Sequence, residues 1–546
     1  MVKKYETDGT QTSNIKADVI VLGCSLPGIV AAHKLKQKFG DTMDVVIIDL
    51  AGTNKGMPKF NAVSFSKDED NTTEECTVKS THQFLEHFSR RYLVMYAKEF
   101  NITIPDEILT PESIPSPLNK LFEYTNGKTV QCTNNFHDFD YLGVFEKFEL
   151  SQYQRLIDES MKNIFHVTKP VTESERRKLL YYDQTTMEKH ICGALLFSTS
   201  REIMRTVVRL VCGASPDTVS VLFYLHQCYR NISCKNYVDG NNTKFREKLL
   251  GYCWKRLAYK LQQSVAGITL KAKAIKKIRT YSDEQVIVET MKGENNYVCN
   301  FLAMAVRPDE LTNINVEPTL LPEREAEIAR FMLPGRVKKF MIQYETDFWR
   351  DDGYSGDILS IRGPIVWAME RPGLSATGSK RRYSSLVGYL KAKMCDGDKQ
   401  DSKEEVIEQL VKLFGESAAN PVNYKESDVE DVFIPRCGDY VALRKWTKEQ
   451  TPGLLEWGAL DIYREGDITG AIEAGHTAYL HVSSCLRPQA QTFEDVSAAE
   501  IPISVHGNFC NRVLANINII SSMSLVAYTT AVYVGIRLAK SYLGKQ

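Results

Sequence analysis

The chain reads Ala17-Asp18-Val19-Ile20-Val21-Leu22 and then Gly23-Cys24-Ser25-Leu26-Pro27-Gly28, and this stretch decides the fold. A helical segment over 29–39 follows, and a second apolar run ends at Val45-Val46-Ile47-Ile48-Asp49. Short β-branched runs of this kind are typical of buried parallel strands. The stretch therefore predicts a strand, a tight glycine turn, a helix and a second parallel strand.

The residue types in this turn suit a dinucleotide. Glycines allow the backbone to turn sharply and approach a pyrophosphate at the N-terminus of a helix, and an acidic residue about 20 positions later accepts ribose hydroxyls. Gly23, Gly28 and Asp49 occupy these places, whereas the middle position, normally glycine, is Ser25. The alternative is a βαβ unit that binds nothing.

Composition limits the possible functions. With 546 residues, 43% of them hydrophobic, the chain can bury a large core divided over two or more domains. Sixty-eight basic residues balance 68 acidic ones, so we expect no nucleic-acid partner. The 13 cysteines form no CxxC pair and the ten histidines show no metal-ligand spacing, which predicts a reducing compartment and no metal site.

The C-terminal region contains a long stretch of low charge. Over residues 517–538 the only charged side chain is Arg537, and about 20 such residues can cross a hydrocarbon layer as a helix. We therefore expect a tail anchor in a lipid bilayer that leaves the body of the protein on the cytosolic side. The alternative is a moderately apolar helix that docks on its own domain or on a partner.

Between these ends, strand-like and helical segments alternate without repeats. Helical patterns cover 146–163, 185–214, 217–229 and 403–414, and strand patterns cover 269–290, 297–306, 335–344 and 357–367. Because strand patterns return late in the chain, we expect a nucleotide domain that is interrupted by a second domain.

Several further motifs follow in a characteristic order. They are Cys212-Gly213-Ala214-Ser215-Pro216-Asp217-Thr218-Val219-Ser220, Val286-Ile287-Val288-Glu289-Thr290, Phe348-Trp349 with Gly353-Tyr354-Ser355-Gly356, and Gly470-Ala471-Ile472-Glu473-Ala474-Gly475. Together with the glycine turn, they make the chain resemble the flavin-dependent amine oxidases of the monoamine oxidase type over almost its whole length.

The resemblance implies an α/β fold in which a Rossmann-type FAD-binding domain carries an inserted α+β substrate domain and a C-terminal helical tail anchor. The expected FAD-type parts are 17–80, 216–306 and 426–489, and the substrate-type parts are 81–215 and 307–425. The remaining segments are a polar arm at 1–16, a linker at 490–516 and the transmembrane anchor at 517–538.

Four departures from the family pattern affect its functional positions. Where a Gly-Gly-Arg-Thr signature contacts the FAD diphosphate, this chain has Lys55-Gly56-Met57-Pro58, and where a lysine holds water near the flavin, it has Asn313. Cys437 matches the cysteine of covalent flavin attachment, but Pro435 and Arg436 replace the preceding glycines. Asp467 stands where the second tyrosine of the amine-binding aromatic cage is expected.

These departures predict a monoamine-oxidase-like protein with degenerate FAD and amine sites, weak or no FAD binding, and little or no catalysis. Its role would be to bind or scaffold an unknown protein partner or small molecule. The alternative is an active FAD-dependent oxidoreductase with an altered substrate, in which Asp467 or Glu465 anchors a cationic group. By analogy with the family, the mitochondrial outer membrane is favoured over the endoplasmic reticulum. The predicted cofactor-binding residues are Gly23, Ser25, Gly28, Asp49, Ile275, Cys437 and Gly470.

Overall fold

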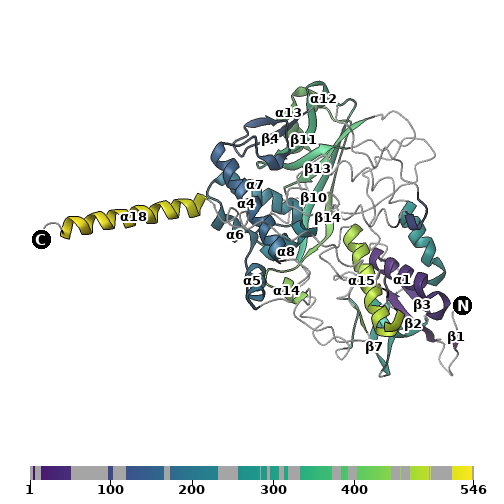
Figure 1. The fold of residues 1–546 in the computed structure, drawn as a ribbon. Coiled ribbons are helices and arrows are strands. Elements are labelled where there is room, and N and C mark those ends of the chain that lie inside the picture. The colour runs from purple at the N-terminus through teal and green to yellow at the C-terminus, as the bar shows by residue number, and fades with distance from the viewer. Residues whose placement is uncertain are drawn as a thin grey trace.

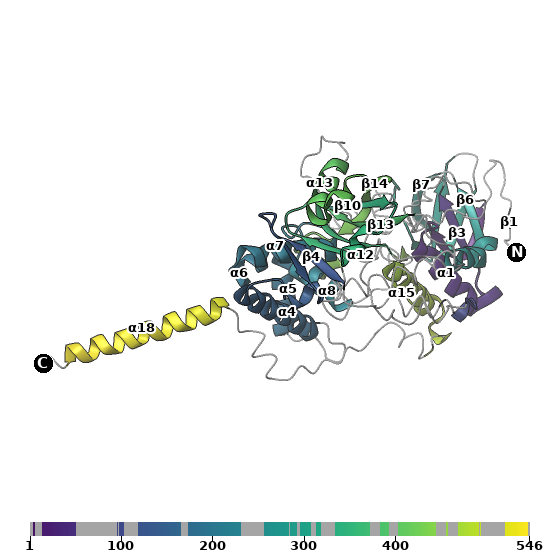
Figure 2. The same cartoon turned by 90° about the horizontal axis from the view of Figure 1, so that it is seen from above.

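A computed structural model describes much of the chain and shows two sheets with associated helices (Figure 1). The described residues are 4–5, 14–50, 96, 98–102, 118–164, 173–230, 256–272, 274–282, 284–291, 295–306, 313–317, 333–371, 383–391, 402–443, 455–456, 468–490, 492 and 519–543. Seen from above, the two sheets lie side by side, and the first helix and the last helix before the tail, α1 and α15, cover the first sheet (Figure 2).

The first sheet contains the predicted strand, turn, helix and strand, which the structure confirms as β2, α1 and β3. Its described strands run in the order β6-β3-β2-β9-β8-β7, with β1 beside β2 and β15 beside β9. β3, β6, β9 and β15 join it as parallel strands, and β7 and β8 extend it as an antiparallel hairpin. The bounds are β1 Lys4–Tyr5, β2 Asn14–Leu22, β3 Val45–Leu50, β6 Thr269–Ala272, β7 Ile275–Ser282, β8 Gln285–Thr290, β9 Asn296–Met304 and β15 Leu455–Glu456.

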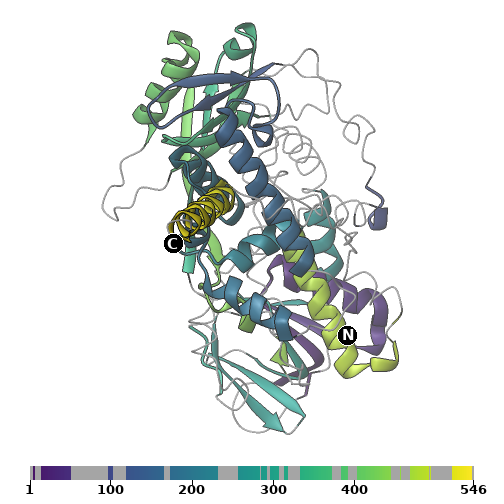
Figure 3. The ribbon, with the colours of Figure 1, turned by 60° about the vertical axis from the view of Figure 1, so that its left-hand side comes forward.

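Both faces of β2 are buried, which explains its near-continuous apolar sequence. Val19 and Val21 belong to the cluster formed with helices α1, Leu26–Phe39, and α15, Ile468–Leu486. Ile20 and Leu22 pack on the opposite face, with residues of β7 and β8. Figure 3 shows α1 and α15 together beside the sheet.

The second sheet runs in the order β14-β10-β13-β12-β11-β4-β5. One face packs against the helical cluster of α4, α6, α7 and α8, and the other packs against α12 and α13. The strands are β4 Asn119–Glu123, β5 Thr129–Cys132, β10 Leu333–Tyr344, β11 Tyr354–Ser360, β12 Ile365–Glu370, β13 Ser384–Leu390 and β14 Asn423–Ile434. The helices are α4 Val144–Ile164, α5 Glu173–Gln184, α6 Met187–Ala194, α7 Ser198–Cys212, α8 Val221–Arg230, α12 Phe348–Asp351, α13 Lys403–Phe414 and α14 Tyr440–Leu443.

Two predicted helices differ from the structure. The segment 185–214 is divided into α6 and α7, because the buried carboxylate of Glu149 accepts hydrogen bonds from the amides of Leu196 and Phe197 at the break. The helix predicted over 217–229 begins only at Val221, where the hydroxyl of Ser220 accepts a 3.1 Å hydrogen bond from the amide of Phe223.

The single strand predicted over 357–367 is a pair of antiparallel strands, β11 and β12. The residues between them include Gly363, whose φ is +87°, and a cis Gly363–Pro364 peptide bond. A glycine in this conformation followed by proline ends a strand, because proline cannot donate to the ladder. The sequence signal for a turn was therefore present within the predicted strand.

The C-terminal helix α18, Ile519–Leu543, projects from the body of the protein (Figure 1). The prediction of a membrane-spanning tail anchor over 517–538 is not supported, since no helix within the described ranges is both long and apolar enough to cross a membrane. The physical reason is the polarity of the hydroxyls that interrupt the apolar run, at Ser521, Ser522, Ser524, Thr529 and Thr530. The domain boundaries and the cellular location stay predictions.

Candidate dinucleotide-binding site

The glycine turn is held between the C-terminal ends of three strands. Gly23 has a φ of +103°, and a Cβ atom at this position would lie 2.5 Å from the carbonyl oxygen of Ala305, just beyond β9. Its amide donates a 2.9 Å hydrogen bond to the carbonyl of Ile48 in β3. A Cβ atom at Gly28 would lie 2.7 Å from the Cβ of Ala305. Gly23 therefore requires glycine for its backbone conformation and packing, and Gly28 requires glycine for packing.

Ser25, in place of the middle glycine, turns its side chain toward the sheet. Its Oγ donates a 2.6 Å hydrogen bond to the carbonyl oxygen of Ala305, and it makes no side-chain cap to α1. The first amides of a helix lack partners within the helix, so those of Leu26 and Gly28 are available to an anion, whereas Pro27 has no N–H. The turn can hold a phosphate group at the N-terminus of α1, with one hydrogen-bond donor fewer than a helix without proline in its first turn.

Asp49 lies half-buried near the end of β3, next to this turn. Burial, and to a lesser degree the charge of Asp49, raises the pKa of the Cys24 thiol to about 11. Cys24 is therefore a neutral thiol at physiological pH, and Asp49 directly follows Ile48, whose carbonyl accepts the hydrogen bond from Gly23 of the turn. A carboxylate at this place can accept hydrogen bonds from ribose hydroxyls.

The helix α15 crosses α1 close to the same turn. A Cβ atom at Gly475 would lie 2.6 Å from the carbonyl oxygen of Pro27 and 2.7 Å from the Cβ of Val30. Gly475 thus allows the two helices to approach closely, and Gly470 lies in the first turn of α15. The structure therefore gathers Gly23, Ser25, Gly28, Asp49 and the α15 helix at one edge of the first sheet.

Two other predicted positions lie within or beside the core of the same domain. Ile275 begins β7, pairs with Thr290 and is buried in the cluster that contains Leu22. Asn313 is exposed and precedes the buried Ile314. Asn313 carries a neutral amide, so no ammonium group is present at this position.

Cys437 contacts the helical domain. Its Sγ donates a 3.2 Å hydrogen bond to the carbonyl oxygen of Asp183, near the end of α5. The carboxylate of Asp183 is buried and accepts hydrogen bonds from the amides of Tyr440, at 3.1 Å, and Val441, at 3.0 Å. Burial and the charges of Asp183 and Asp439 raise the pKa of Cys437 to about 11. The thiol is therefore protonated and poorly suited to nucleophilic attack.

Other predicted positions lie outside the described residues. These are Lys55-Gly56-Met57-Pro58, Glu465 and Asp467. Within the described part of the chain, no group of three or more histidine, cysteine, aspartate or glutamate side chains is arranged to hold a metal ion.

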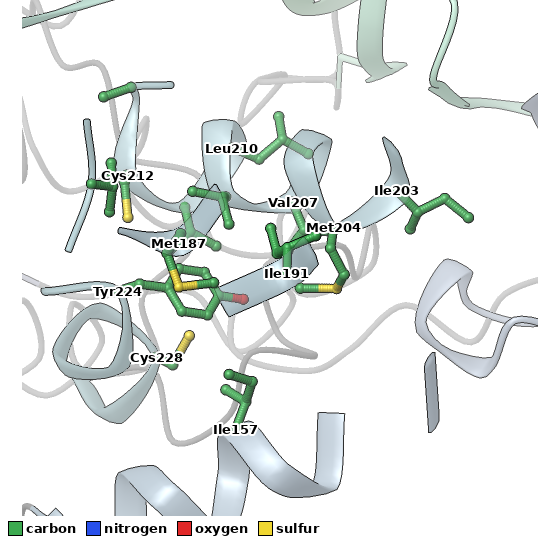
Figure 4. Packing of buried hydrophobic residues seen from close by; sticks show 14 of the residues in the cluster. Ile157, Met187, Ile191, Ile203, Met204, Val207, Leu210, Cys212, Tyr224 and Cys228 are labelled. Atoms are coloured by element: carbon green, nitrogen blue, oxygen red, sulfur yellow. The ribbon is translucent and has the colours of Figure 1, made fainter. Parts of the chain in front are cut away.

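Sequence reasoning missed a small apolar cavity between the helical cluster and the second sheet. Figure 4 shows Ile203, Met204 and Val207, which lie on α7 and belong to the buried hydrophobic cluster. The lining residues are Phe136, Phe139, Tyr141, Gln154, Ile203, Met204, Val207 and Leu359. These residues come from four separate segments of the chain. The only local sequence signal was the i, i+1, i+4 spacing of Ile203, Met204 and Val207, which marks one buried face of α7.

Comparisons with known proteins agree with this arrangement. The family model of flavin-containing amine oxidoreductases matches residues 254–478. A Mycobacterium tuberculosis relative, described as a flavin-containing monoamine oxidase, is 25% identical over 301 residues, or 53% of this chain and 64% of the relative. The flavin-containing amine oxidase A of Canis lupus familiaris is 24% identical and is covered over 68% of its length.

Solved structures share the fold at lower identity. A double mutant of putrescine oxidase, from a structure-based redesign of cofactor binding, superposes with a TM-score of 0.66 and 16% identity, covering 86% of this chain and 99% of that one. Cyclohexylamine oxidase from Brevibacterium oxydans gives a TM-score of 0.61, also at 16% identity and covering 86% of this chain and 99% of that one. The likeness to these structures shows a shared α/β fold.

Together, the family match and the curated relatives show that the chain is similar to the flavin-containing amine oxidoreductases, at low identity. The alignment spans slightly less than two thirds of the Mycobacterium relative, at 64%.

Proposed function

We propose that this protein binds FAD non-covalently at the glycine turn and that its amine oxidase activity is weak or absent. The observation that carries the proposal is the turn itself. Gly23 and Gly28 pack against Ala305, and the amides that begin α1 face the same edge of the sheet as Asp49. These features fit the diphosphate and the ribose of a dinucleotide.

The chain's own residues would bind and orient the cofactor. The N-terminus of α1 stabilises the diphosphate charge, Asp49 accepts ribose hydroxyls, and α15 closes the site beside Pro27. When bound, FAD supplies the capacity to accept a hydride from an amine carbon.

Two side chains support weak catalysis and a non-covalent cofactor. The Cys437 thiol stays protonated and donates a hydrogen bond to the carbonyl oxygen of Asp183. It is therefore poorly suited to form a covalent bond to flavin. Asn313 provides a neutral amide where the family resemblance implies an ammonium group. Loss of a positioned charge in an active site costs about 3 kcal/mol of transition-state stabilisation.

A second candidate function is an active FAD-dependent oxidoreductase with an altered substrate. Its support is the similarity to relatives described as a flavin-containing monoamine oxidase and a flavin-containing amine oxidase.

The test uses the full purified chain with added FAD. We expect the visible absorbance of bound oxidised flavin, and we expect acid precipitation to leave the flavin in the supernatant. The variant Gly28→Val should abolish flavin retention, whereas Gly193→Ala, which meets no atom within 4 Å, should leave it intact. A folded protein that never retains FAD would overturn the proposal, as would flavin that stays with the precipitate.

Turnover of amines separates the two candidates. We expect the FAD-loaded chain to release little or no hydrogen peroxide from aromatic and aliphatic amines. Sustained peroxide release from any of these amines would favour the second candidate.

A further inference from the structure

Asp183, near the C-terminal end of α5, accepts four hydrogen bonds from one short segment of the chain. Its main-chain carbonyl oxygen accepts from Sγ of Cys437 at 3.2 Å and from the amide of Gly438 at 2.8 Å. Its carboxylate accepts from the amide of Tyr440 at Oδ1, at 3.1 Å, and from the amide of Val441 at Oδ2, at 3.0 Å. A single residue therefore holds a segment that begins 254 positions further along the chain.

The direction of these four bonds follows from the groups themselves. A backbone amide can only donate, and a carbonyl oxygen can only accept, so no tautomer has to be assumed. The carbonyl of Asp183 lies at the end of a helix, where carbonyl groups lack partners within the helix. The Asp183 side chain is 0% exposed, and a buried carboxylate is costly unless its oxygens accept hydrogen bonds. The segment and Asp183 therefore satisfy each other's polar groups.

The segment forms a turn over residues 436–441, here called the Cys437 turn, between two buried anchors. Tyr440 is fully buried and, like Ile434 at the end of β14, belongs to the hydrophobic cluster of the helical domain. Between these anchors, Arg436 and Gly438 are exposed and Cys437 is half-buried. The thiol thus lies within reach of solvent and is not protected by complete burial.

The contacts with Asp183 disfavour the reactive form of this thiol. Burial, and then the charges of Asp183 and Asp439, raise the pKa of Cys437 to about 11. The thiol also donates to a carbonyl at the C-terminus of α5, the negative end of the helix dipole, where a thiolate is unfavourable. Because the thiolate is the nucleophile, the thiol stays unreactive while it remains in this position.

We propose that Asp183 is a positioning residue whose carboxylate holds the Cys437 turn against α5 and thereby masks a thiol that is otherwise reactive. When the amides of Tyr440 and Val441 lose this acceptor, the turn leaves α5. The thiol then loses its contact with the carbonyl and becomes a surface cysteine that alkylating reagents attack. This role of Asp183 does not depend on cofactor binding.

Glu149 provides a matched comparison for a carboxylate that only stabilises the fold. It is 1% exposed, it accepts hydrogen bonds from two backbone amides, those of Leu196 and Phe197, and it belongs to the same group of helices. These amides lie at the break between α6 and α7, away from the Cys437 turn in sequence. Glu149→Ala therefore removes the same kind of support without touching the turn.

The test is timed iodoacetamide treatment of the full chain at pH 8, with mass spectrometry of each cysteine peptide. Cys132 is the internal reference, because it is buried in the core cluster and burial raises its pKa to about 11 as well. The measured quantity is the alkylation rate of Cys437 divided by that of Cys132, which global unfolding does not raise. We expect Asp183→Ala to increase this ratio about tenfold and Glu149→Ala to leave it unchanged.

Asp183→Asn is the milder variant and decides the outcome if Asp183→Ala does not fold. Its carboxamide oxygen can still accept one of the two amides, so we expect a ratio between those of the wild-type chain and Asp183→Ala. A ratio that stays at the wild-type value in the Asp183 variants would overturn the proposal. An equal increase in Glu149→Ala would overturn it as well, because the thiol would then report general loosening of the helical domain.

Discussion

The hydroxyl of Ser25 donates a 2.6 Å hydrogen bond to the carbonyl oxygen of Ala305, 280 residues further along the chain. This bond joins the start of α1 to the end of β9 and turns the serine side chain toward the sheet. The position that normally brings the backbone closest to a pyrophosphate is thereby used to stabilise the fold. Under the proposed function, the serine in place of glycine therefore affects both stability and cofactor affinity.

Restoring glycine at this position should separate the two effects. We expect Ser25→Gly to bind FAD several-fold more tightly, because the backbone can approach the diphosphate. It should also unfold more easily by about 1 kcal/mol, through the lost hydrogen bond and the greater entropy of the unfolded chain. Titration of FAD fluorescence and urea denaturation measure the two quantities. Ser25→Ala should share the loss of stability without the gain in affinity.

Gly475 should tolerate no side chain. The added Cβ of Gly475→Ala would lie 2.6 Å from the carbonyl oxygen of Pro27, so the α1–α15 contact must shift. We expect a loss of about 1–3 kcal/mol in the free energy of unfolding. The matched control is Gly193→Ala in α6, where the new methyl group meets nothing within 4 Å and helix propensity improves. Equal denaturation midpoints for the two variants would contradict the close approach of the helices.

Glu99 should make the fold sensitive to acid. Its pKa of about 2 in the folded protein lies below the ordinary value of 4.5, so its ionised form stabilises the fold above pH 4.5. This stability is lost as the pH falls from 4.5 toward 2. We expect Glu99→Gln to cost about 1–2 kcal/mol at pH 7 and almost nothing near pH 2. The exposed Glu408, paired with Lys412, provides a control, since Glu408→Gln should change little at either pH. Urea denaturation at several pH values measures the difference.

Cys437 should react slowly with alkylating reagents. Raising its pKa from 9.0 to about 11 lowers the thiolate fraction about a hundredfold at pH 8. Mass spectrometry after timed iodoacetamide treatment should therefore find Cys437 modified far more slowly in the native chain than in urea. Rapid modification of the native protein would contradict the hydrogen bond to the Asp183 carbonyl.

The parts of the fold that depend on local pattern were predictable from the sequence. The β2–α1–β3 unit followed from two apolar runs on either side of a glycine turn, and α13 followed from its helical spacing. The division of 185–214 into two helices was not predictable, because it depends on Glu149, which is distant in sequence. For the same reason, the contact between Cys437 and Asp183 joins residues 254 positions apart and left no local signal.

Both sheets are assembled from segments that are far apart in the chain. β4 finds its parallel neighbour only in β11, more than 200 residues later, and β2 lies beside β9 from a similarly distant segment. A ribosomal product that stops between these partners would leave strand edges unpaired, and such edges are templates for aggregation. Premature termination should thus yield insoluble polypeptide for the cell's quality-control machinery to degrade.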